Sequence, residues 1–268
     1  METAPPELSR LALVCGNGTL QQLRGIRVIV FGLGGVGSWC AEALVRSGVG
    51  CLTIVDSDSV CVTNINRQVQ ATKKTVGLFK AQVLRERLLE INPLCNVTAV
   101  TKVFCIGNSS VFNIESFDYV IDAIDSLTNK IDLIMLCTKT GVPVFSCMGM
   151  AQKLDPTQIK TAGIWQTHGC PLARLVRTGL RKRNFNGSFT AVYSSERLPL
   201  RPAVSLPCGK AICLCPSRDA DDPDAPKEWC GGKKIINGSA VTVTASAGMV
   251  LASLVLQDVM RKANSYGG

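Results

Sequence analysis

Several common features are missing from this sequence, and each absence removes a class of protein. The first residues, METAPPELSR, lack the basic and then apolar pattern of a secretory signal peptide, so we do not expect secretion. The chain has a single histidine, His168, which is most simply interpreted as a surface residue. The spacing of the later cysteines gives no two Cys-x-x-Cys pairs, which argues against a zinc ribbon. These cysteines are Cys208, Cys213, Cys215 and Cys230.

Acidic residues are in deficit. Lysine and arginine total 29 against 20 acids, which gives a formal charge of +9 and a pI near 9.0. Such an excess favours polyanionic partners, nucleic acid first and anionic membrane second. Cysteines are abundant, but 13 is an odd number and their spacing is irregular. Several lie inside apolar runs, where a thiol behaves as a small hydrophobe, so we expect reduced thiols in a cytoplasmic protein.

No charged residue occurs between Ala240 and Leu256, a length that approaches the lower limit for a membrane span. The run also contains small and polar residues at Thr242, Thr244, Ser246, Gly248 and Ser253. Such residues suit a helix buried in the core or at a subunit interface better than one in lipid. We therefore expect a soluble protein without membrane association.

Short apolar runs alternate with helical patterns through the first half of the chain. The apolar runs cover 26–31, 51–55, 97–103, 119–124 and 142–147, and the helical patterns cover 36–47, about 80–91 and 128–139. This alternation predicts an α/β fold with a doubly wound, mainly parallel sheet covered on both faces. We expect a Rossmann-like nucleotide-binding region at 1–150 and a smaller carboxyl-terminal lobe at 151–268, which binds substrate within the same domain. The proline- and acid-rich 198–232 segment predicts an exposed, partly mobile loop.

A glycine-rich turn follows the first apolar run. Gly32, Gly34 and Gly37 in GLGGVGS match the dinucleotide fingerprint, because they lie between a predicted strand and a predicted helix. Glycines let a phosphate approach backbone amides, and the helix start adds a favourable dipole. Asp56 ends the second apolar run, where a carboxylate can accept hydrogen bonds from ribose hydroxyls. These features alone suit a nicotinamide enzyme equally well.

Two further cations favour ATP over a dinucleotide. ATP carries about four negative charges, against about two on a dinucleotide pyrophosphate, and so calls for side-chain cations and a metal. Arg67 and Lys80 supply the cations, and Asp125, at the end of VIDAIDS, is placed to hold Mg²⁺. The alternative makes Asp125 a helix N-cap and Lys80 a solvated helix residue.

Five motifs resemble one superfamily when they are taken in order along the chain: GLGGVGSWCAEAL, IVDSDSVCVTNINRQ, VGLFKAQVLRERLLEINP, YVIDAIDS and SCMGMAQKLDPTQI. The sequence resembles the ThiF/MoeB superfamily of ubiquitin-activating-type adenylyltransferases, and within it the tRNA threonylcarbamoyladenosine dehydratase branch. The match covers about 9–159. It implies that Gly34 and Gly35 line the phosphates, that Asp56 binds ribose, and that Mg²⁺ lies at Asp125. The other nucleotide-binding residues implied are Gly32, Gly37, Asp58, Asn64, Arg67, Gln68 and Lys80, with Arg10 reaching the ATP of a neighbouring subunit.

Such a site can adenylate a carboxylate. Attack on the α-phosphorus of ATP gives an acyl-adenylate, while Arg67, Lys80 and Mg²⁺ stabilise the departing pyrophosphate. The resemblance implies that the carboxylate belongs to the threonyl group of a modified adenosine beside the tRNA anticodon. A group of the same substrate then closes a ring with net loss of water, so an enzymic cysteine is optional. Cys230 in EWCGG is the candidate nucleophile for branches that need one.

No acid occurs between Asp155 and Glu196, where basic residues gather. On a helix, arginines in ARLVRTGLRKR share one face, which suits spaced phosphates of tRNA. The predicted tRNA contacts are Arg174, Arg177, Arg181, Lys182 and Arg183. The alternative is an ordinary solvated helix face. Cys170 stands where the resembled pattern has an acid, whereas Glu196 in AVYSSE matches it again.

Three functions remain open. The first is the tRNA dehydratase, the second is an activator of a ubiquitin-like or sulfur-carrier protein, and the third is a nicotinamide-dependent oxidoreductase or sensor. The positive charge and the lack of zinc knuckles favour the first over the second. The resemblance also implies a homodimer, for which the apolar carboxyl-terminal segment offers a surface, and a sulfur-transfer protein is a further partner to test.

Overall fold

The computed structural model describes residues 4–197 and 237–265. The predicted loop at 198–232 and the four later cysteines, including Cys230, lie outside these residues. Every cysteine within the described ranges is a free thiol. Burial raises the pKa of Cys95 to about 11 and that of Cys147 to about 12, so these thiols are small hydrophobic groups rather than nucleophiles.

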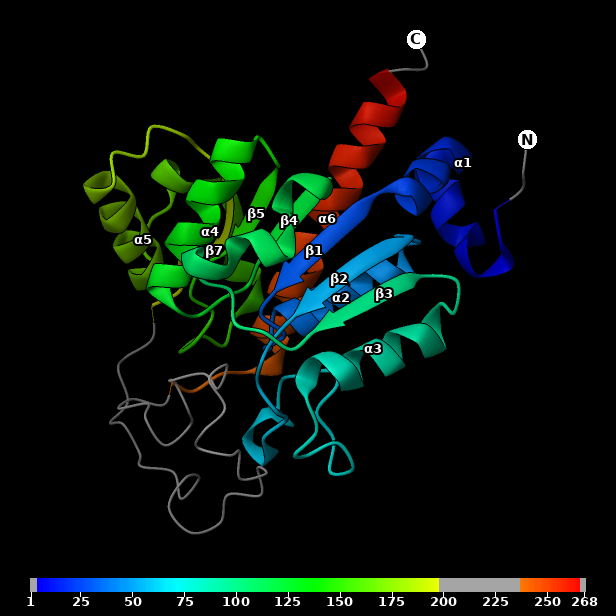
Figure 1. The fold of residues 1–268 in the computed structure, drawn as a ribbon, viewed down its shortest axis with the longest axis horizontal. Helices are drawn as coiled ribbons and strands as arrows, with labels where there is room; N and C mark the ends of the chain where they lie inside the picture. The colour runs from blue at the N-terminus through cyan, green and yellow to red at the C-terminus, as the bar shows by residue number, and fades with distance from the viewer. Residues whose placement is uncertain (1–3, 198–236, 266–268) are drawn as a thin grey trace.

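Seven strands form one sheet in the order β3-β2-β1-β4-β5-β7-β6 (Figure 1). They are β1 (Arg27–Phe31), β2 (Cys51–Val55), β3 (Asn96–Val100), β4 (Tyr119–Asp122), β5 (Val144–Cys147), β6 (Ile159–Gly163) and β7 (Thr190–Ser194). All neighbours are parallel except β6 and β7, which pair antiparallel. The predicted mainly parallel, doubly wound sheet is confirmed. The strand order reverses between β1 and β4, so their carboxyl ends mark the switch point where ligands bind in such sheets.

Helices cover both faces of the sheet. The α-helices are α1 (Ser9–Gly25), α2 (Gly37–Arg46), α3 (Lys80–Ile91), α4 (Leu127–Thr140), α5 (Pro171–Lys182) and α6 (Val241–Ser265). Short 3-10 helices are η1 (Pro6–Leu8), η2 (Val62–Asn64), η3 (Ile106–Phe112), η4 (Ile114–Ser116), η5 (Pro156–Gln158) and η6 (Ile164–Gln166). Alternate side chains of β1 enter two separate cores: Val28 and Val30 pack with α1, α2, α3 and α6, whereas Ile29 and Phe31 pack with α4 and α5.

The apolar segment near the carboxyl terminus forms α6, which packs against α2 and α1. Its buried stripe recurs at helical spacing through Val243, Ala247, Leu251, Val255 and Val259. At Gly248 a Cβ would lie 2.5 Å from the Val36 carbonyl oxygen, so the two helices approach backbone to backbone. Within the described residues, Val241–Asn264 is the one helix long and apolar enough to cross a membrane. Of its most apolar 18 residues, 44% are buried in the protein. The buried stripe is the one expected for a core helix.

Elements from beyond residue 150 complete the same sheet and both cores, because β6 and β7 extend its edge and α5 and α6 cover its two faces. The division into a nucleotide-binding region at 1–150 and a substrate-binding region at 151–268 stays a prediction.

Candidate functional site

The turn between β1 and α2 packs so closely that two of its positions admit only glycine. Gly32 has a φ of 85°, and a Cβ there would lie 2.7 Å from the Ala123 carbonyl oxygen. A Cβ on Gly37 would overlap the Gly32 carbonyl. At Gly34, by contrast, no described atom lies within 4 Å of the Cβ position, so this backbone faces open space. The turn thus combines tight packing with an open backbone at the start of a helix, as a phosphate site requires.

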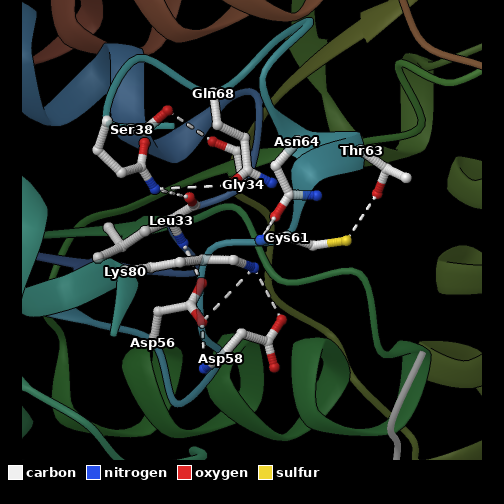
Figure 2. Close-up of polar contacts among 11 residues, drawn as sticks. Leu33, Gly34, Ser38, Asp56, Asp58, Cys61, Thr63, Asn64, Gln68 and Lys80 are labelled. Carbon is white, nitrogen blue, oxygen red and sulfur yellow. Dashed lines mark hydrogen bonds and ion pairs between the residues drawn. The ribbon is translucent and has the colours of Figure 1, made fainter. Parts of the chain in front are cut away.

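Asp56 ties the end of β2 to the glycine turn (Figure 2). Its Oδ2 accepts a hydrogen bond from the Leu33 amide at 2.7 Å, and its Oδ1 accepts one from the Asp58 amide at 2.8 Å. Burial raises the pKa of Asp56, while the Lys80 cation acts in the opposite direction. The carboxylate therefore sits beside the turn at the place predicted for ribose recognition, at the carboxyl edge of the sheet.

Lys80 begins α3 and is almost fully buried, with 7% of its side chain exposed. Its Nζ donates to Asp58 Oδ2 at 2.8 Å and lies 3.9 Å from Asp56 Oδ1 (Figure 2). Burial alone would lower the pKa of Lys80. Three carboxylates, those of Asp56, Asp58 and Asp125, outweigh burial and raise that pKa. Lys80 is thus a fixed cation and not a solvated helix residue.

Arg67 lies in the turn that follows η2. Its Nη1 donates to the Thr63 carbonyl and to Asn66 Oδ1, both at 2.8 Å, and its own carbonyl accepts from Trp39 Nε1 at 3.0 Å. A Cβ on Gly35 would lie 3.2 Å from Arg67 Cγ, so the arginine stem packs on the glycine turn. Burial lowers the pKa of Arg67 from its very high ordinary value. The guanidinium stays charged, because that value lies far above neutral pH.

The loop on both sides of Arg67 adds polar groups near the glycine turn. Asn64 is buried, and its Oδ1 accepts from the Cys61 amide at 3.1 Å (Figure 2). Gln68 is buried beside Gln70, whose Nε2 donates to the Leu33 carbonyl at 2.9 Å. The Oε1 of Gln70 is the single buried side-chain oxygen or nitrogen without a hydrogen-bond partner among the residues with described side chains. Gln70, which was not predicted as a site residue, therefore contacts the glycine turn at Leu33.

Asp125 is exposed in the turn between β4 and α4. The N-cap of α4 is Ser126, so Asp125 does not cap this helix. The turn abuts the glycine turn, because Gly32 packs on Ala123, and Asp125 raises the pKa of Lys80. Asp58 is a second carboxylate at this edge and is half exposed. One or two carboxylates together with phosphate oxygens suit Mg²⁺, so these residues fit the predicted metal.

A buried ion pair behind Asp125 was not predicted. Lys130 Nζ donates to Asp122 Oδ2 at 2.7 Å and to the Cys147 carbonyl at 3.0 Å, and both charged side chains are fully buried. Ser146 Oγ donates to the same Oδ2 at 2.5 Å, and Asp122 Oδ1 accepts from the Ile124 amide at 3.0 Å. The pair therefore fixes the backbone that carries Asp125. Its one signal in the sequence is a charged residue inside an apolar run and another inside a helix.

The predicted tRNA-binding residues have different surroundings on and after α5. Arg177 is half-buried and donates to the Thr167 carbonyl at 2.9 Å and to the Thr167 hydroxyl. Arg181 lies over the Trp165 ring, with 5.2 Å from Cζ to the ring centroid, and Arg183 pairs with Asp132. Arg174 and Lys182 are exposed. Arg177, Arg181 and Arg183 are thus engaged with their own chain, although Arg181 and Arg183 stay exposed as Arg174 and Lys182 do.

The remaining predicted residues lie away from the glycine turn. Arg10 is exposed near the start of α1, two residues after Leu8, which contacts Gly48 just before β2 begins. The helix α1 lies beyond the amino end of β1, whereas the glycine turn follows the carboxyl end of that strand (Figure 1). His168 is exposed, with its ring edge-on to Tyr193, as predicted for a surface residue. Among the residues that the structure describes, no group of three or more His, Cys, Asp or Glu side chains could hold a metal ion by itself.

The chain belongs to the ThiF family, whose model matches residues 8–265. The tRNA threonylcarbamoyladenosine dehydratase of Escherichia coli is 37% identical over 264 residues, covering 96% of this chain and 94% of that protein. The protein of the same name from Bacillus subtilis is 42% identical over 190 residues, covering 71% of this chain and 75% of the relative.

Solved structures agree with this placement. The crystal structure of Escherichia coli tRNA N6-threonylcarbamoyladenosine dehydratase in complex with ATP superimposes with a TM-score of 0.79 at 32% identity, and 99% of each chain is covered. By contrast, an adenylyltransferase and sulfurtransferase of Drosophila grimshawi matches 52% of this chain, at 34% identity. The resemblance to the dehydratase branch is confirmed.

Proposed function

We propose that this chain is an ATP-dependent tRNA threonylcarbamoyladenosine dehydratase, which adenylates the threonyl carboxylate of the modified adenosine and promotes its ring closure. The observation that carries the proposal is the convergence of an open glycine turn, Asp56, Arg67, Lys80 and Asp125 at one edge of the sheet. The Escherichia coli dehydratase named above matches nearly the whole chain, which supports this substrate over the alternatives.

In the first step a carboxylate oxygen of the substrate attacks the α-phosphorus of ATP, and the bond from that phosphorus to the bridging oxygen of pyrophosphate breaks. Negative charge grows on the departing pyrophosphate. Lys80, kept protonated by three carboxylates, and Arg67, fixed on Gly35, are cations placed to stabilise it without rearrangement. The carboxylate is already ionised, so this step needs no general base. Mg²⁺, when held by Asp125 and phosphate oxygens, supplies further positive charge to the triphosphate.

In the second step a nucleophile of the same nucleoside attacks the acyl carbon, and AMP leaves with one oxygen of the original carboxylate. The nucleoside therefore loses the elements of water while ATP becomes AMP and pyrophosphate. Because the nucleophile belongs to the substrate, this route requires no thiolate from the protein. This is consistent with the buried, high-pKa thiols of Cys95 and Cys147.

The surface cations at the end of α5 are the proposed contacts to tRNA phosphates. Arg174, Arg181, Lys182 and Arg183 are exposed, although Arg183 also pairs with Asp132 and Arg181 lies over Trp165. The 156–195 region of the sequence itself contains no acid. We further propose a cytoplasmic homodimer in which Arg10 approaches the partner's nucleotide. The exposed side chains of Met249 and Met260 on α6 offer apolar surface for such a contact.

Purified protein should convert ATP to AMP and pyrophosphate when tRNA bearing threonylcarbamoyladenosine is present. Mass spectrometry of the digested tRNA should show the nucleoside lighter by one water, in amounts that match AMP. An unmodified transcript of the same tRNA is the control and should not stimulate AMP formation. Equal AMP with both tRNAs would refute the proposal. Adenylation of a diglycine carboxyl terminus, dependent on a cysteine, would instead favour the activator of a ubiquitin-like or sulfur-carrier protein.

A further inference from the structure

Asn66 connects the predicted phosphate-binding arginine to the segment that leads into α6. Its Oδ1 accepts from Arg67 Nη1 at 2.8 Å, and its Nδ2 donates to the Ser239 carbonyl at 2.8 Å. Ser239 is 173 positions away in the sequence and lies two residues before α6 begins. One side chain therefore joins a loop at the nucleotide site to the start of the last helix.

The chemistry of both partners fixes the orientation of this amide. A guanidinium can only donate hydrogen bonds, and a backbone carbonyl can only accept them. The bridging side chain must therefore offer an acceptor at one end and a donor at the other, which a primary amide does. A carboxylate would lose the donor, and an alkyl side chain would lose both contacts.

The bridge holds Arg67 in a packed setting. A Cβ added to Gly35 would lie 3.0 Å from Thr244 Oγ1 and 3.2 Å from Arg67 Cγ, so little space is left between the turn and these two side chains. The glycine turn thus packs against both the start of α6 and the arginine stem. A free arginine side chain has many rotamers, so fixing it before the nucleotide arrives lowers the entropic cost of binding.

We propose that Asn66 is a positioning residue, which sets the guanidinium of Arg67 against the glycine turn by anchoring it to the backbone before α6. The inference rests on the proposed adenylation, in which Arg67 faces the pyrophosphate part of ATP and not the AMP part. It follows that Asn66 affects the binding of ATP and leaves the binding of AMP unchanged.

The test compares the affinities of ATP and AMP, each with Mg²⁺, by calorimetry on the full-length protein. Asn66→Ala should weaken ATP about tenfold, the effect of losing one hydrogen bond to a charged group, and change AMP less than about twofold. Asn66→Gln, which keeps the amide, should recover part of the loss. Asn96→Ala is the matched control. Asn96 is an exposed asparagine at the start of β3, at the amino ends of the strands and away from the glycine turn. It should bind both nucleotides normally.

A double-mutant cycle with Arg67→Ala tests whether Asn66 acts through the arginine. If it does, Asn66→Ala causes no further loss of ATP affinity once Arg67 is gone. An equal loss in both backgrounds, or equal weakening of ATP and AMP, would overturn the proposal. These binding measurements use no tRNA. A wild-type protein that binds ATP but ignores modified tRNA would therefore refute the proposed function without deciding the role of Asn66.

Discussion

Asp56 and Lys80 carry opposite charges at one point of the fold, directly after β2 ends and where α3 begins. Asp56 and Lys80 were predicted to bind nucleotide, and the structure brings them within 3.9 Å of each other at the glycine turn. Local pattern suffices there, because a strand end and a helix start place side chains at the same edge. The Asp122–Lys130 pair and the Asn66–Ser239 bridge were not predicted. Both depend on tertiary packing, which residue spacing does not specify.

Replacing Lys80 tests the nucleotide site at this scale. We expect Lys80→Ala to lower ATP turnover roughly 10²- to 10³-fold, because a preorganised cation beside the triphosphate is lost. Circular dichroism should show an intact fold. Lys73→Ala is the control, since Lys73 is exposed in the preceding loop. Near-normal turnover by folded Lys80→Ala protein would show that this cation does not act on ATP.

Lys130 is expected to matter for stability first. Lys130→Met leaves the Asp122 carboxylate buried without its cation and should lower the free energy of unfolding by about 3–5 kcal/mol, as measured in urea. Adding Asp122→Asn should restore part of that loss, because the amide is neutral and its oxygen still accepts from the Ile124 amide. A loss below about 1 kcal/mol in Lys130→Met would mean that the pair is solvated more than its burial indicates.

At the scale of whole elements, β1 to β5 lie where apolar runs predicted them, with ends that differ by a few residues. Four of these runs end near glycine or aspartate, and β1, β2, β4 and β5 are largely buried, so the hydrophobic pattern is strong there. In β3 only Val97 is buried. The strands β6 and β7 were missed. The edge strand β6 is half exposed and has no continuous apolar run, and the apolar run of β7 covers only 191–193 between Thr190 and Ser194. Their pairing depends on the sheet already formed by the others.

The helix α5 carries two kinds of arginine that helical spacing places on one face: Arg174 is exposed, whereas Arg177 is half-buried and bonded to Thr167. Arg174→Ala combined with Lys182→Ala should weaken tRNA binding. The slope of log affinity against log salt should become less negative by about one to two, because each exposed cation neutralises about one phosphate. Arg177→Ala should leave that slope unchanged and instead lower the melting temperature, since Arg177 holds the backbone at Thr167. Filter binding at several salt concentrations checks the first expectation. A slope change with Arg177→Ala alone would reverse the assignment.

In the whole molecule, α1, which carries Arg10, lies beyond the amino end of β1, whereas the proposed nucleotide site lies at the carboxyl end of that strand (Figure 1). An arginine there cannot complete the site of its own chain, so its predicted contact with ATP requires a second subunit. The apolar, exposed positions of α6 and the free surface of α1, where Leu13 and Val14 are largely exposed, supply area that a partner would cover. Residue spacing does not specify this arrangement, which follows from the position of α1 beyond the amino ends of the strands (Figure 1).

Mixed dimers test this arrangement. Arg10→Ala and Lys80→Ala proteins should each be nearly inactive alone, because every site in either homodimer lacks one cation. When subunits are exchanged in equal amounts, half of the dimers carry one of each, and one site in such a dimer has both its own Lys80 and the partner's intact Arg10. Activity should therefore return to about a quarter of the wild-type value, as two-fold symmetry requires. Exchange is verified by native mass spectrometry of the two tagged variants. Mixed dimers that stay inactive, or an Arg10→Ala protein that turns over ATP normally, would show that Arg10 does not serve a neighbouring site.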